Sequence, residues 1–311
     1  MGFRVVLIES EAKVSLKLNN LIVNKGEGDI WIPIDDISMI IIDNLQVTLT
    51  ARMLSVIAEH NVGIVISDQK HNPIGLYSSY DNHSRISKTV KYQIETTKEK
   101  YDEIWKFIIK NKIDNQKKVI QRIKPIDEII REMECFKNEV ENGDPTNREA
   151  HAAKVYFNTL MDSSFSRGNE EILLNSGLDY GYAIIRSYIA RICVGYGLNT
   201  QLGMHHRSEY NRFNLADDLI EPLRAFVDLY AYSILEDAEF FMPEHRHKLV
   251  NMLNHKVYYN SKNMYLCNMI EEYVEQYASY LSGNRDRIEI PDIDGYTIPN
   301  ENYLLGEEDE L

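Results

Sequence analysis

The sequence contains little cysteine and no long hydrophobic run. Its three cysteines, at positions 135, 193 and 267, form no CxxC pair. Thiols so few and so far apart argue against a disulfide framework or a thiolate zinc site and indicate a reducing compartment. No apolar segment approaches the roughly 20 residues that cross a bilayer, and Glu9 and Glu11 interrupt the N-terminus before a signal-peptide core could form. We therefore expect a cytoplasmic protein that does not enter a membrane.

A net positive charge is also lacking. The formal charge is −14 and the isoelectric point is near 5.1, which counts against a surface that is basic overall and binds nucleic acid everywhere. Any nucleic-acid site must therefore be local. The composition, 44% hydrophobic and 26% charged over 311 residues, is that of a globular chain with one large or two ordinary domains. We find no Walker loop, no GxGxxG and no internal repeat.

The first 80 residues predict a small β domain. Short β-branched runs alternate with Asn, Asp and Gly signals, and a single helix is expected at 50–61, with Thr50 as its N-cap and Asn61 as its stop. We assign residues 1–84 to a β-sandwich-like domain that serves as a scaffold or a dimer interface. The expected strands are FRVVLIE, KVSLKLNNLIV, DIWIPI, ISMIIID, VGIVISD and NPIGLY.

From residue 85 the pattern changes to long helices. Between Arg85 and Lys124 we count twelve Lys or Arg against five Asp or Glu, with Tyr92, Tyr101 and Trp105 interleaved. A basic face with aromatic residues can follow a phosphate backbone, although lysine-rich helices are also commonly solvated and their aromatic residues buried. Both interpretations stay open. A buried helix is predicted at 175–202, and an acidic, loosely held tail from about residue 283.

A helix beginning near Asp144 carries an unusual carboxylate. Glu149 shares a helical face with Ala152, Ala153 and Tyr156. A buried unpaired glutamate would cost several kcal/mol or remain protonated. Either a metal or another cation therefore lies beside Glu149, or this face is wet.

The stretch 203–224 gathers residues that suit a hard divalent metal. It contains His205, His206, Asp217, Asp218 and Glu221, and carboxylate oxygen with one imidazole suits Mg²⁺ or Mn²⁺. A plainer interpretation is that Asp218 is a helix N-cap and that Glu221, three residues on, completes a capping box.

Several motifs taken together resemble one family, the CRISPR-associated integrases that capture new spacers, written here as Cas-one. The resemblance covers essentially the whole chain and is nearest to members of the type II subtype, which accompany single-protein RNA-guided effector nucleases. One departure is Leu223, where relatives often have an aromatic residue. The motifs are PTNREAHAAKVYF at 145–157, GLDYGY at 177–182, GMHH at 203–206 and DLIEPLR at 218–224.

The resemblance implies a metal-binding and catalytic triad of Glu149, His206 and Glu221. The family pattern Gly-x-x-His selects His206, with His205 as the alternative, and Asp218 matches an acid that assists or caps. The implied fold is α+β and multidomain: the N-terminal β domain is followed by an all-α catalytic domain at 85–311. Arg148 and Arg224 are candidate phosphate contacts.

The resemblance also implies a reaction and partners. A single Mg²⁺ or Mn²⁺ polarises a repeat phosphodiester, which the prespacer 3′-OH attacks; water in its place gives endonuclease activity. The expected partners are double-stranded prespacer and repeat DNA, a second copy of the chain in a homodimer, and the small adaptation protein Cas-two in a heterohexamer. The effector nuclease and a further adaptation protein are additional candidates. The alternatives are a structure-specific DNA repair endonuclease and a noncatalytic helical scaffold.

Overall fold

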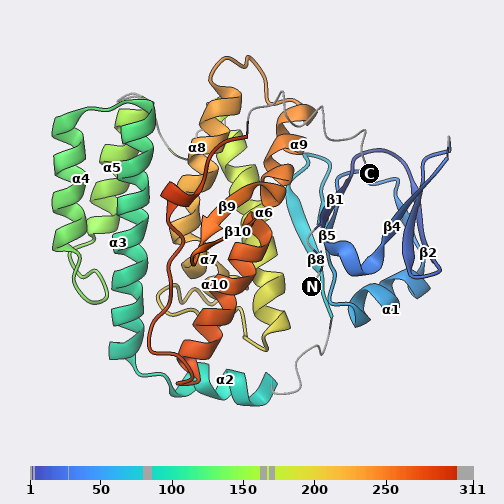
Figure 1. The fold of residues 1–311 in the computed structure, drawn as a ribbon, viewed down its shortest axis with the longest axis horizontal. Coiled ribbons are helices and arrows are strands. Elements are labelled where there is room, and N and C mark those ends of the chain that lie inside the picture. Colours follow the sequence, from blue (N-terminus) through green and yellow to red (C-terminus); the bar gives the residue numbers. More distant parts are fainter. Residues whose placement is uncertain are drawn as a thin grey trace.

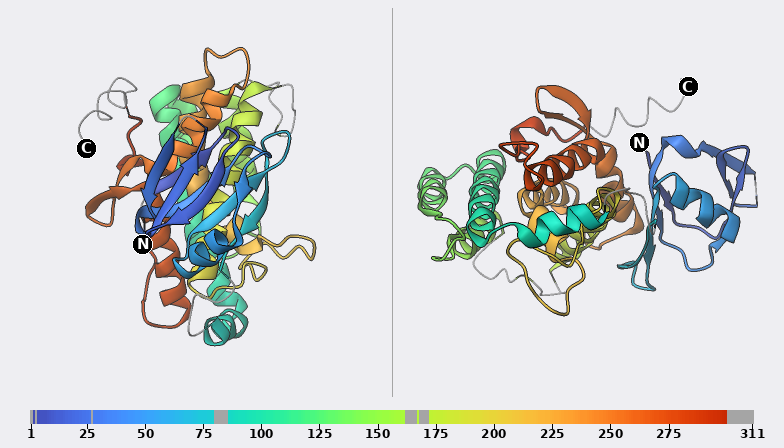
Figure 2. Two further views of the ribbon diagram at one scale, coloured as in Figure 1. Left: turned by 90° about the vertical axis from the view of Figure 1, so that its right-hand side faces the viewer. Right: turned by 90° about the horizontal axis from the view of Figure 1, so that it is seen from below.

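The computed structural model describes residues 2, 4–26, 28–79, 86–161, 167 and 172–299. A strand-rich N-terminal part lies beside a larger helical part, which confirms the predicted α+β class (Figure 1). The view from below shows that the two parts sit next to each other and do not interleave (Figure 2). The predicted domain boundary at residue 84 lies outside the described residues. No helix in the described part of the chain combines the length and apolar character of a membrane span.

The N-terminal part contains two four-stranded sheets. In the first, β1, β5 and β7 are parallel and β8 is antiparallel to β7. In the second, the order is β4-β3-β2-β6. The strands are β1 (Arg4–Ile8), β2 (Lys13–Lys17), β3 (Asn20–Asn24), β4 (Asp29–Pro33), β5 (Ile37–Ile42), β6 (Thr48–Leu49), β7 (Gly63–Ser67) and β8 (Pro73–Tyr77), with a short 3₁₀ helix η1 (Ile34–Asp36).

Strand β5 joins the two parts of the molecule because it is buried on both faces. Ile40 and Ile42 face the core between the two sheets, whereas Met39 and Ile41 belong to the core of the helical part. Successive residues of a strand point to opposite faces, so one apolar run supplies both cores. Helix α1 (Ala51–Glu59) packs on the first core, and the predicted N-cap is confirmed: the Thr50 hydroxyl accepts the Met53 N–H at 3.2 Å.

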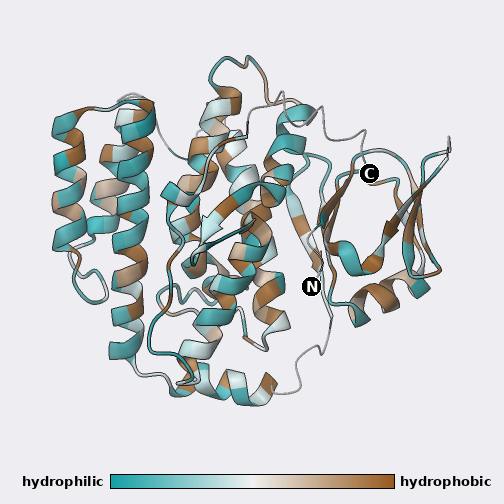
Figure 3. Cartoon of the chain, in the orientation of Figure 1, coloured by the Kyte–Doolittle hydropathy of each residue, from teal (hydrophilic) through white to brown (hydrophobic). Residues whose placement is uncertain are grey.

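The helical part is built around α6, which confirms the predicted buried helix but ends at Gly195, short of the predicted end at residue 202. Figure 1 shows α3, α4 and α5 together at the end remote from the two N-terminal sheets, and Figure 3 shows that hydrophobic and hydrophilic residues alternate along these helices. The elements are α2 (Ile86–Glu95), α3 (Lys98–Ile123), α4 (Asp127–Glu139), α5 (Arg148–Leu160), α6 (Leu173–Gly195), α7 (Asn214–Leu219), η2 (Glu221–Leu223), α8 (Arg224–Leu235), α9 (Pro243–Asn251), η3 (Met252–Asn254), α10 (Leu266–Leu281) and η4 (Ile293–Gly295).

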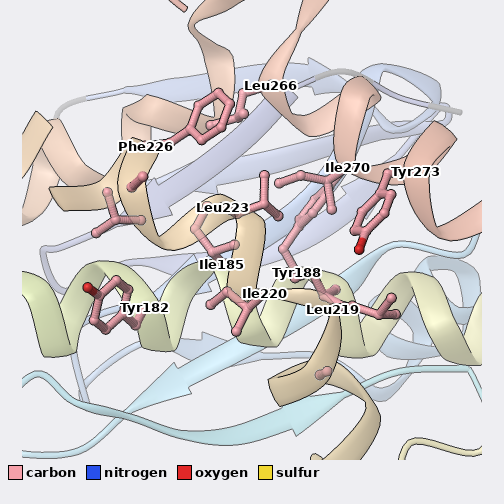
Figure 4. Close-up of a cluster of buried hydrophobic side chains, with 14 of the residues drawn as sticks. Tyr182, Ile185, Tyr188, Leu219, Ile220, Leu223, Phe226, Leu266, Ile270 and Tyr273 are labelled. Atoms are coloured by element: carbon pink, nitrogen blue, oxygen red, sulfur yellow. The ribbon is translucent and has the colours of Figure 1, made fainter. Parts of the chain in front are cut away.

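The segment from α7 through η2 to α8 is held by the side chains of α6 and α10. In Figure 4, Ile185 and Tyr188 of α6 lie against Leu219, Ile220 and the residues that follow them, and Ile270 of α10 covers the other side. All five side chains are buried. The short helical turn that carries Glu221 is therefore fixed from two directions by close packing.

The expectation of an all-α C-terminal domain is wrong at one place. Strands β9 (Lys256–Tyr259) and β10 (Lys262–Tyr265) form an antiparallel hairpin. Its two-residue turn, Asn260 and Ser261, has φ values of 48° and 65°, which is the backbone of the turns that favour hairpins. Val257 and Tyr259 are buried while Tyr258 is exposed, the alternation of a half-buried strand. That alternation is visible in the sequence and was missed.

The expectation of a loosely held tail from residue 283 is wrong for residues 288–299, which we call the C-terminal strap. Ile293 and Tyr296 are almost fully buried. The Lys118 ammonium lies 2.7 Å from both carboxylate oxygens of Asp292 and 2.8 Å from Asp294. The strap's polar composition concealed apolar residues that pack against α3 and α8. Residues 300–311, including GEEDEL, lie outside the described residues.

Candidate active site on helix α3

A buried lysine joins two of the three residues of the predicted triad. The Nζ of Lys112 lies 2.5 Å from Oε1 of Glu149 and 2.5 Å from Oε2 of Glu221. The Lys112 and Glu221 side chains are 6% and 4% exposed, whereas that of Glu149 is 29% exposed. Three elements, α3, α5 and η2, therefore bring one cation and two carboxylates together, and the site opens to solvent on the Glu149 side.

The start of α5 places Glu149. We expected this helix to begin near Asp144, but it begins at Arg148, because Asp144 and Asn147 both adopt positive φ and form a turn. The Asp144 carboxylate still caps the helix, accepting the backbone N–H groups of Arg148 at 2.9 Å and Glu149 at 3.0 Å. The small, fully buried Ala152 on the same face allows close packing. Of the alternatives left open for Glu149, a cation lies beside it, Lys112, and its side chain is also partly exposed.

Glu221 is held by two cations and by the backbone around it. The Nε of Arg224 lies 2.9 Å from its Oε1, and the Arg224 guanidinium stacks on the Tyr182 ring at 4.6 Å. Asn115, fully buried on α3, lies with its Nδ2 2.9 Å from the carbonyl oxygens of both Pro222 and Pro291. One side chain thus ties the Glu221 turn to the C-terminal strap.

The charges in this cluster are mutually stabilised. Burial alone would raise the pKa of Glu221, but Arg224 and Lys112 outweigh burial and lower it to about 2. For Lys112, burial disfavours the ammonium, yet the charges of Glu221 and Glu149 hold its pKa above the ordinary value. The carboxylate of Glu221 and the ammonium of Lys112 are consequently both ionised at neutral pH.

His206 is fixed by Asp218. The Asp218 carboxylate, fully buried in α7, accepts the backbone N–H groups of Met204 at 2.6 Å, His205 at 3.1 Å and His206 at 3.0 Å. It also lies 2.7 Å from Nδ1 of His206, and this hydrogen bond, more than the surrounding charges, raises the pKa of His206. Asp218 therefore holds the preceding loop, and its interpretation as a simple helix N-cap is wrong.

This loop leaves no room for a side chain at Gly203. A Cβ atom there would lie 2.3 Å from the carbonyl oxygen of His206 and 2.8 Å from Oδ2 of Asp218. The glycine of the GMHH motif is thus required by the close approach of the loop to the carboxylate.

The two adjacent histidines have different surroundings. The His205 ring stacks on the buried Trp105 of α3, with centroids 4.1 Å apart and an interplanar angle of 4°. His206 meets the edge of the same indole, with centroids 5.9 Å apart. Because Nδ1 of His206 is engaged by Asp218, its Nε2 is the nitrogen left to bind a metal, as in carboxylate–histidine–metal arrangements.

The structure does not gather the whole predicted triad around one point. Among the described residues, no three His, Cys, Asp or Glu side chains are close enough together to hold a metal ion. Glu149 and Glu221 meet at Lys112, while His206 is held beside Trp105, two helical turns earlier on α3. The charge of Glu221 nevertheless contributes to the raised pKa of His206, so the two residues are electrostatically coupled.

Much of the basic segment at 85–124 is neutralised within the protein. Lys117 pairs with Asp114 and Glu134, and Lys118 with Asp292 and Asp294. Arg122 donates to the strap carbonyls of Ile293 and Tyr296, and Lys124 to carbonyls at the end of α5. Trp105 and Tyr101 are buried. The count of twelve cations therefore overstates the charge available to a phosphate backbone.

The candidate phosphate contacts are also engaged. Arg148 forms an ion pair with Glu139, with Nε 3.1 Å from its carboxylate, and Arg224 holds Glu221. In this structure both arginines therefore contact carboxylates of the protein.

Lys112 and Asn115 are the residues that sequence reasoning missed. Lys112 was counted only as one cation of the basic segment. The signal that could have singled it out is a buried stripe on α3, in which Trp105, Ile109, Lys112 and Gln116 recur at helical spacing. A lysine inside such a stripe needs a carboxylate partner.

Comparisons with known proteins agree with this architecture. The family model described as CRISPR associated protein Cas1 matches residues 5–257. The CRISPR-associated endonuclease Cas1 of Neisseria meningitidis serogroup C is 32% identical over 297 residues, covering 94% of this chain and 97% of the relative. A second relative, an endonuclease Cas1 of Francisella tularensis subsp. novicida, is 33% identical over 126 residues, covering 38% and 39% of the two chains.

Solved structures share the fold at lower identity. A casposase bound to integration product superposes with a TM-score of 0.75 at 21% identity, covering 97% of this chain and 98% of that one. A CAS1 protein from Thermotoga maritima gives 0.73 at 17% identity, covering 90% and 97%. A Cas6-RT-Cas1–Cas2 complex gives 0.73 at 18% identity over 93% of this chain and 36% of that one.

Proposed function

Because the chain belongs to the Cas1 family of CRISPR-associated proteins, we propose that it is a metal-dependent DNA endonuclease and integrase of CRISPR adaptation. It inserts prespacer DNA into the repeat array, the 3′-OH of the prespacer attacking a repeat phosphodiester. The observation that carries the proposal is the convergence of Glu149 and Glu221 on one buried positive charge.

The residues present fit Mg²⁺ or Mn²⁺. Glu149 and Glu221 offer carboxylate oxygens, and His206 offers Nε2, a donor set without sulfur that suits a hard divalent ion. When bound, such an ion supplies Lewis-acid polarisation of the phosphodiester. We assign the metal-binding and catalytic roles to these three residues, and prefer His206 to His205 because the His205 ring is stacked on Trp105.

Other residues of the chain position this set. Asp218 fixes the His206 ring and the loop that carries it. Arg224 and Asn115 hold the Glu221 turn from its two sides. In the joining reaction, the prespacer 3′-hydroxyl loses its proton and its oxygen bonds to a repeat phosphorus. The bond from that phosphorus to the 3′-oxygen of the cleaved strand breaks, and this departing oxygen takes a proton. The number of phosphodiesters is unchanged, so no external energy source is needed.

We further propose that the chain acts as a homodimer that joins Cas2 in a heterohexamer on double-stranded prespacer and repeat DNA. Relatives of the same fold are named for complexes with Cas2 and with DNA. The effector nuclease and a further adaptation protein are additional candidate partners.

Strand joining tests the reaction directly. The protein, with Cas2, is given a supercoiled plasmid bearing a repeat and a prespacer that ends in either 3′-OH or 3′-deoxy, with Mn²⁺ or with EDTA. We expect joined product only with the hydroxyl and the metal. Joining of the 3′-deoxy prespacer would refute the integrase mechanism. Cleavage without joining, even with Cas2 and the hydroxyl, would instead favour a structure-specific repair endonuclease.

Variants test the residues. Replacing Glu149, His206 or Glu221 by alanine should reduce joining by at least about 100-fold, because each removes a proposed ligand. His247→Ala, on exposed surface of α9, is the matched control and should retain activity. Unchanged DNA processing in the Glu149 and His206 variants would support a noncatalytic scaffold. A greater loss of Mn²⁺ affinity in His205→Ala than in His206→Ala would reverse the choice of histidine.

A further inference from the structure

Lys112 occupies the place where the charge of a metal ion is expected. Its ammonium contacts one oxygen of each proposed carboxylate ligand, and its side chain is 6% exposed. A lysine is seldom buried so deeply. In this place it satisfies the negative charge of both glutamates at once, which is the electrostatic task of a bound divalent ion.

The two carboxylates need a cation between them. Because both oxygens lie 2.5 Å from the same nitrogen, they are within about 5 Å of each other. Like charges at that separation repel, and the repulsion is strong where solvent is excluded. Of the two glutamates, Arg224 contacts Glu221, so among the described residues Lys112 is the cation that holds Glu149 and Glu221 together.

The surroundings allow the lysine to leave. Its ammonium is carried on a flexible four-carbon chain, and the site is open on the Glu149 side, where that side chain is 29% exposed. Arg224, in contrast, is held by Glu221 and by the Tyr182 ring. An ion entering from solvent therefore meets the lysine at the more accessible carboxylate.

We propose that Lys112 is a resident cation: it keeps Glu149 and Glu221 in ligand geometry while no divalent metal is bound, and metal binding displaces it. The displaced ammonium then pairs with a DNA phosphate, so that metal binding and DNA binding favour each other. This inference rests on the proposed function, because it takes the two glutamates as metal ligands. It makes Lys112 a positioning residue that competes with the metal.

Removing the competing charge tests the inference. Lys112→Met keeps an unbranched apolar stem, and Lys112→Arg keeps the charge. Mn²⁺ binding to the whole protein without DNA is measured at pH 7.5 by the electron paramagnetic resonance signal of free Mn²⁺. We expect at least tenfold tighter binding in Lys112→Met than in the wild type, and no such gain in Lys112→Arg. A purely structural lysine predicts weaker or unchanged binding in Lys112→Met, which would overturn the inference.

Adding DNA tests the coupling. A short double-stranded oligonucleotide should tighten Mn²⁺ binding several-fold in the wild type, because a phosphate receives the displaced ammonium. The same oligonucleotide should have a smaller effect in Lys112→Met, which has no ammonium to transfer. Equal enhancement in the two proteins would contradict the coupling.

A measurement on the wild-type protein is independent of how the variants fold. Brief treatment with an amine-acylating reagent, read by mass spectrometry, reports the accessibility of each lysine. Lys112 should react faster when Mn²⁺ is present, while Lys118, bound to Asp292 and Asp294, should react at the same rate and serves as the internal control. An unchanged Lys112 rate at saturating Mn²⁺ would reject displacement.

Failure of this inference is distinguishable from failure of the proposed function. If the wild type and Lys112→Met bind Mn²⁺ equally and Glu149→Ala abolishes binding, the proposed metal site is supported and the proposed role of Lys112 is refuted. If neither protein binds Mn²⁺ with or without DNA, the proposed metal site and the proposed role of Lys112 are both refuted.

Discussion

Two buried carboxylates, seven residues apart in sequence, have pKa values shifted in opposite directions. Glu221 lies between Lys112 and Arg224, and its pKa falls to about 2. Asp228, fully buried in α8, receives a hydrogen bond from the Tyr182 hydroxyl, and its pKa rises to about 6. Burial acts on both in the same direction, toward the neutral acid.

The difference between the two sites lies in their partners. Cations in direct contact more than offset the desolvation of Glu221. For Asp228, the hydroxyls of Tyr182 and Tyr156 and the charges of Arg224 and Arg167 act against desolvation but do not offset it. One carboxylate is therefore kept ionised, as a metal ligand must be, and the other is close to accepting a proton. Burial alone does not tell which of two acids belongs to a site.

The largest expected effect comes from removing the charge of Glu221. Glu221→Gln leaves Lys112 and Arg224 without their buried carboxylate, and should lower the free energy of unfolding by about 3–5 kcal/mol in urea denaturation. Glu149→Gln is the matched control: its side chain is 29% exposed, and the loss should be about 1 kcal/mol. Equal losses would mean that burial does not distinguish the two partners of Lys112.

Asp228→Asn should instead raise the free energy of unfolding. The shift from 3.8 to about 6 corresponds to about 3 kcal/mol of destabilisation above pH 6. Below pH 3.8 the carboxyl is protonated in both the folded and the unfolded chain, so its raised pKa does not lower the free energy of unfolding. The loss of stability grows as pH rises from 3.8 to 6. The variant should therefore gain about 1–3 kcal/mol at pH 8 and less at pH 5, measured by denaturation at both pH values. The facing groups are Tyr182 on α6, Tyr156 on α5, Arg224 and Arg167. A gain independent of pH would exclude ionisation as its cause.

The smallest effect is expected where the carboxylate is exposed. Asp292, 47% exposed, pairs with Lys118 on α3, and Lys118 keeps Asp114 and Asp294 as partners. Asp292→Asn should therefore cost no more than about 1 kcal/mol, and less at high salt. A loss of stability comparable to that of Glu221→Gln would show that the pair of Asp292 and Lys118 stabilises the fold much more than the exposure of Asp292 implies.

Local features were predictable from the sequence, and long-range pairings were not. The Thr50 cap, most strands of the N-terminal part and the buried helix α6 follow from patterns within a few residues. The run KVSLKLNNLIV was wrong as a single strand, because a turn at Leu18 and Asn19 divides it into β2 and β3. The β9–β10 hairpin has such a pattern as well, but it was overlooked among helices. Residue patterns singled out Glu149 and the stretch that contains His206 and Glu221, but only the resemblance to a family joined these three residues as one triad.

Lys112 shows why the rest of the site was out of reach. Its partners are 37 residues away on α5 and further still on η2, and which lysine meets them depends on how three elements pack. Asn115 is a similar case, because its partners Pro222 and Pro291 are joined only in the folded chain. Composition showed a basic segment, and only the fold showed that carboxylates and carbonyls already use much of its charge.

The tie between Asn115 and the C-terminal strap has a consequence for the order in which the protein is made. Asn115 accepts the backbone N–H of Ile293, 178 residues further along the chain, so the groups that hold the Glu221 turn are synthesised at different times. A nascent chain that has not yet reached residue 293 lacks this brace, although Glu149 and Glu221 have already been synthesised. The Glu221 turn should therefore be fully braced only after residue 293 has emerged and the strap has folded back onto α3.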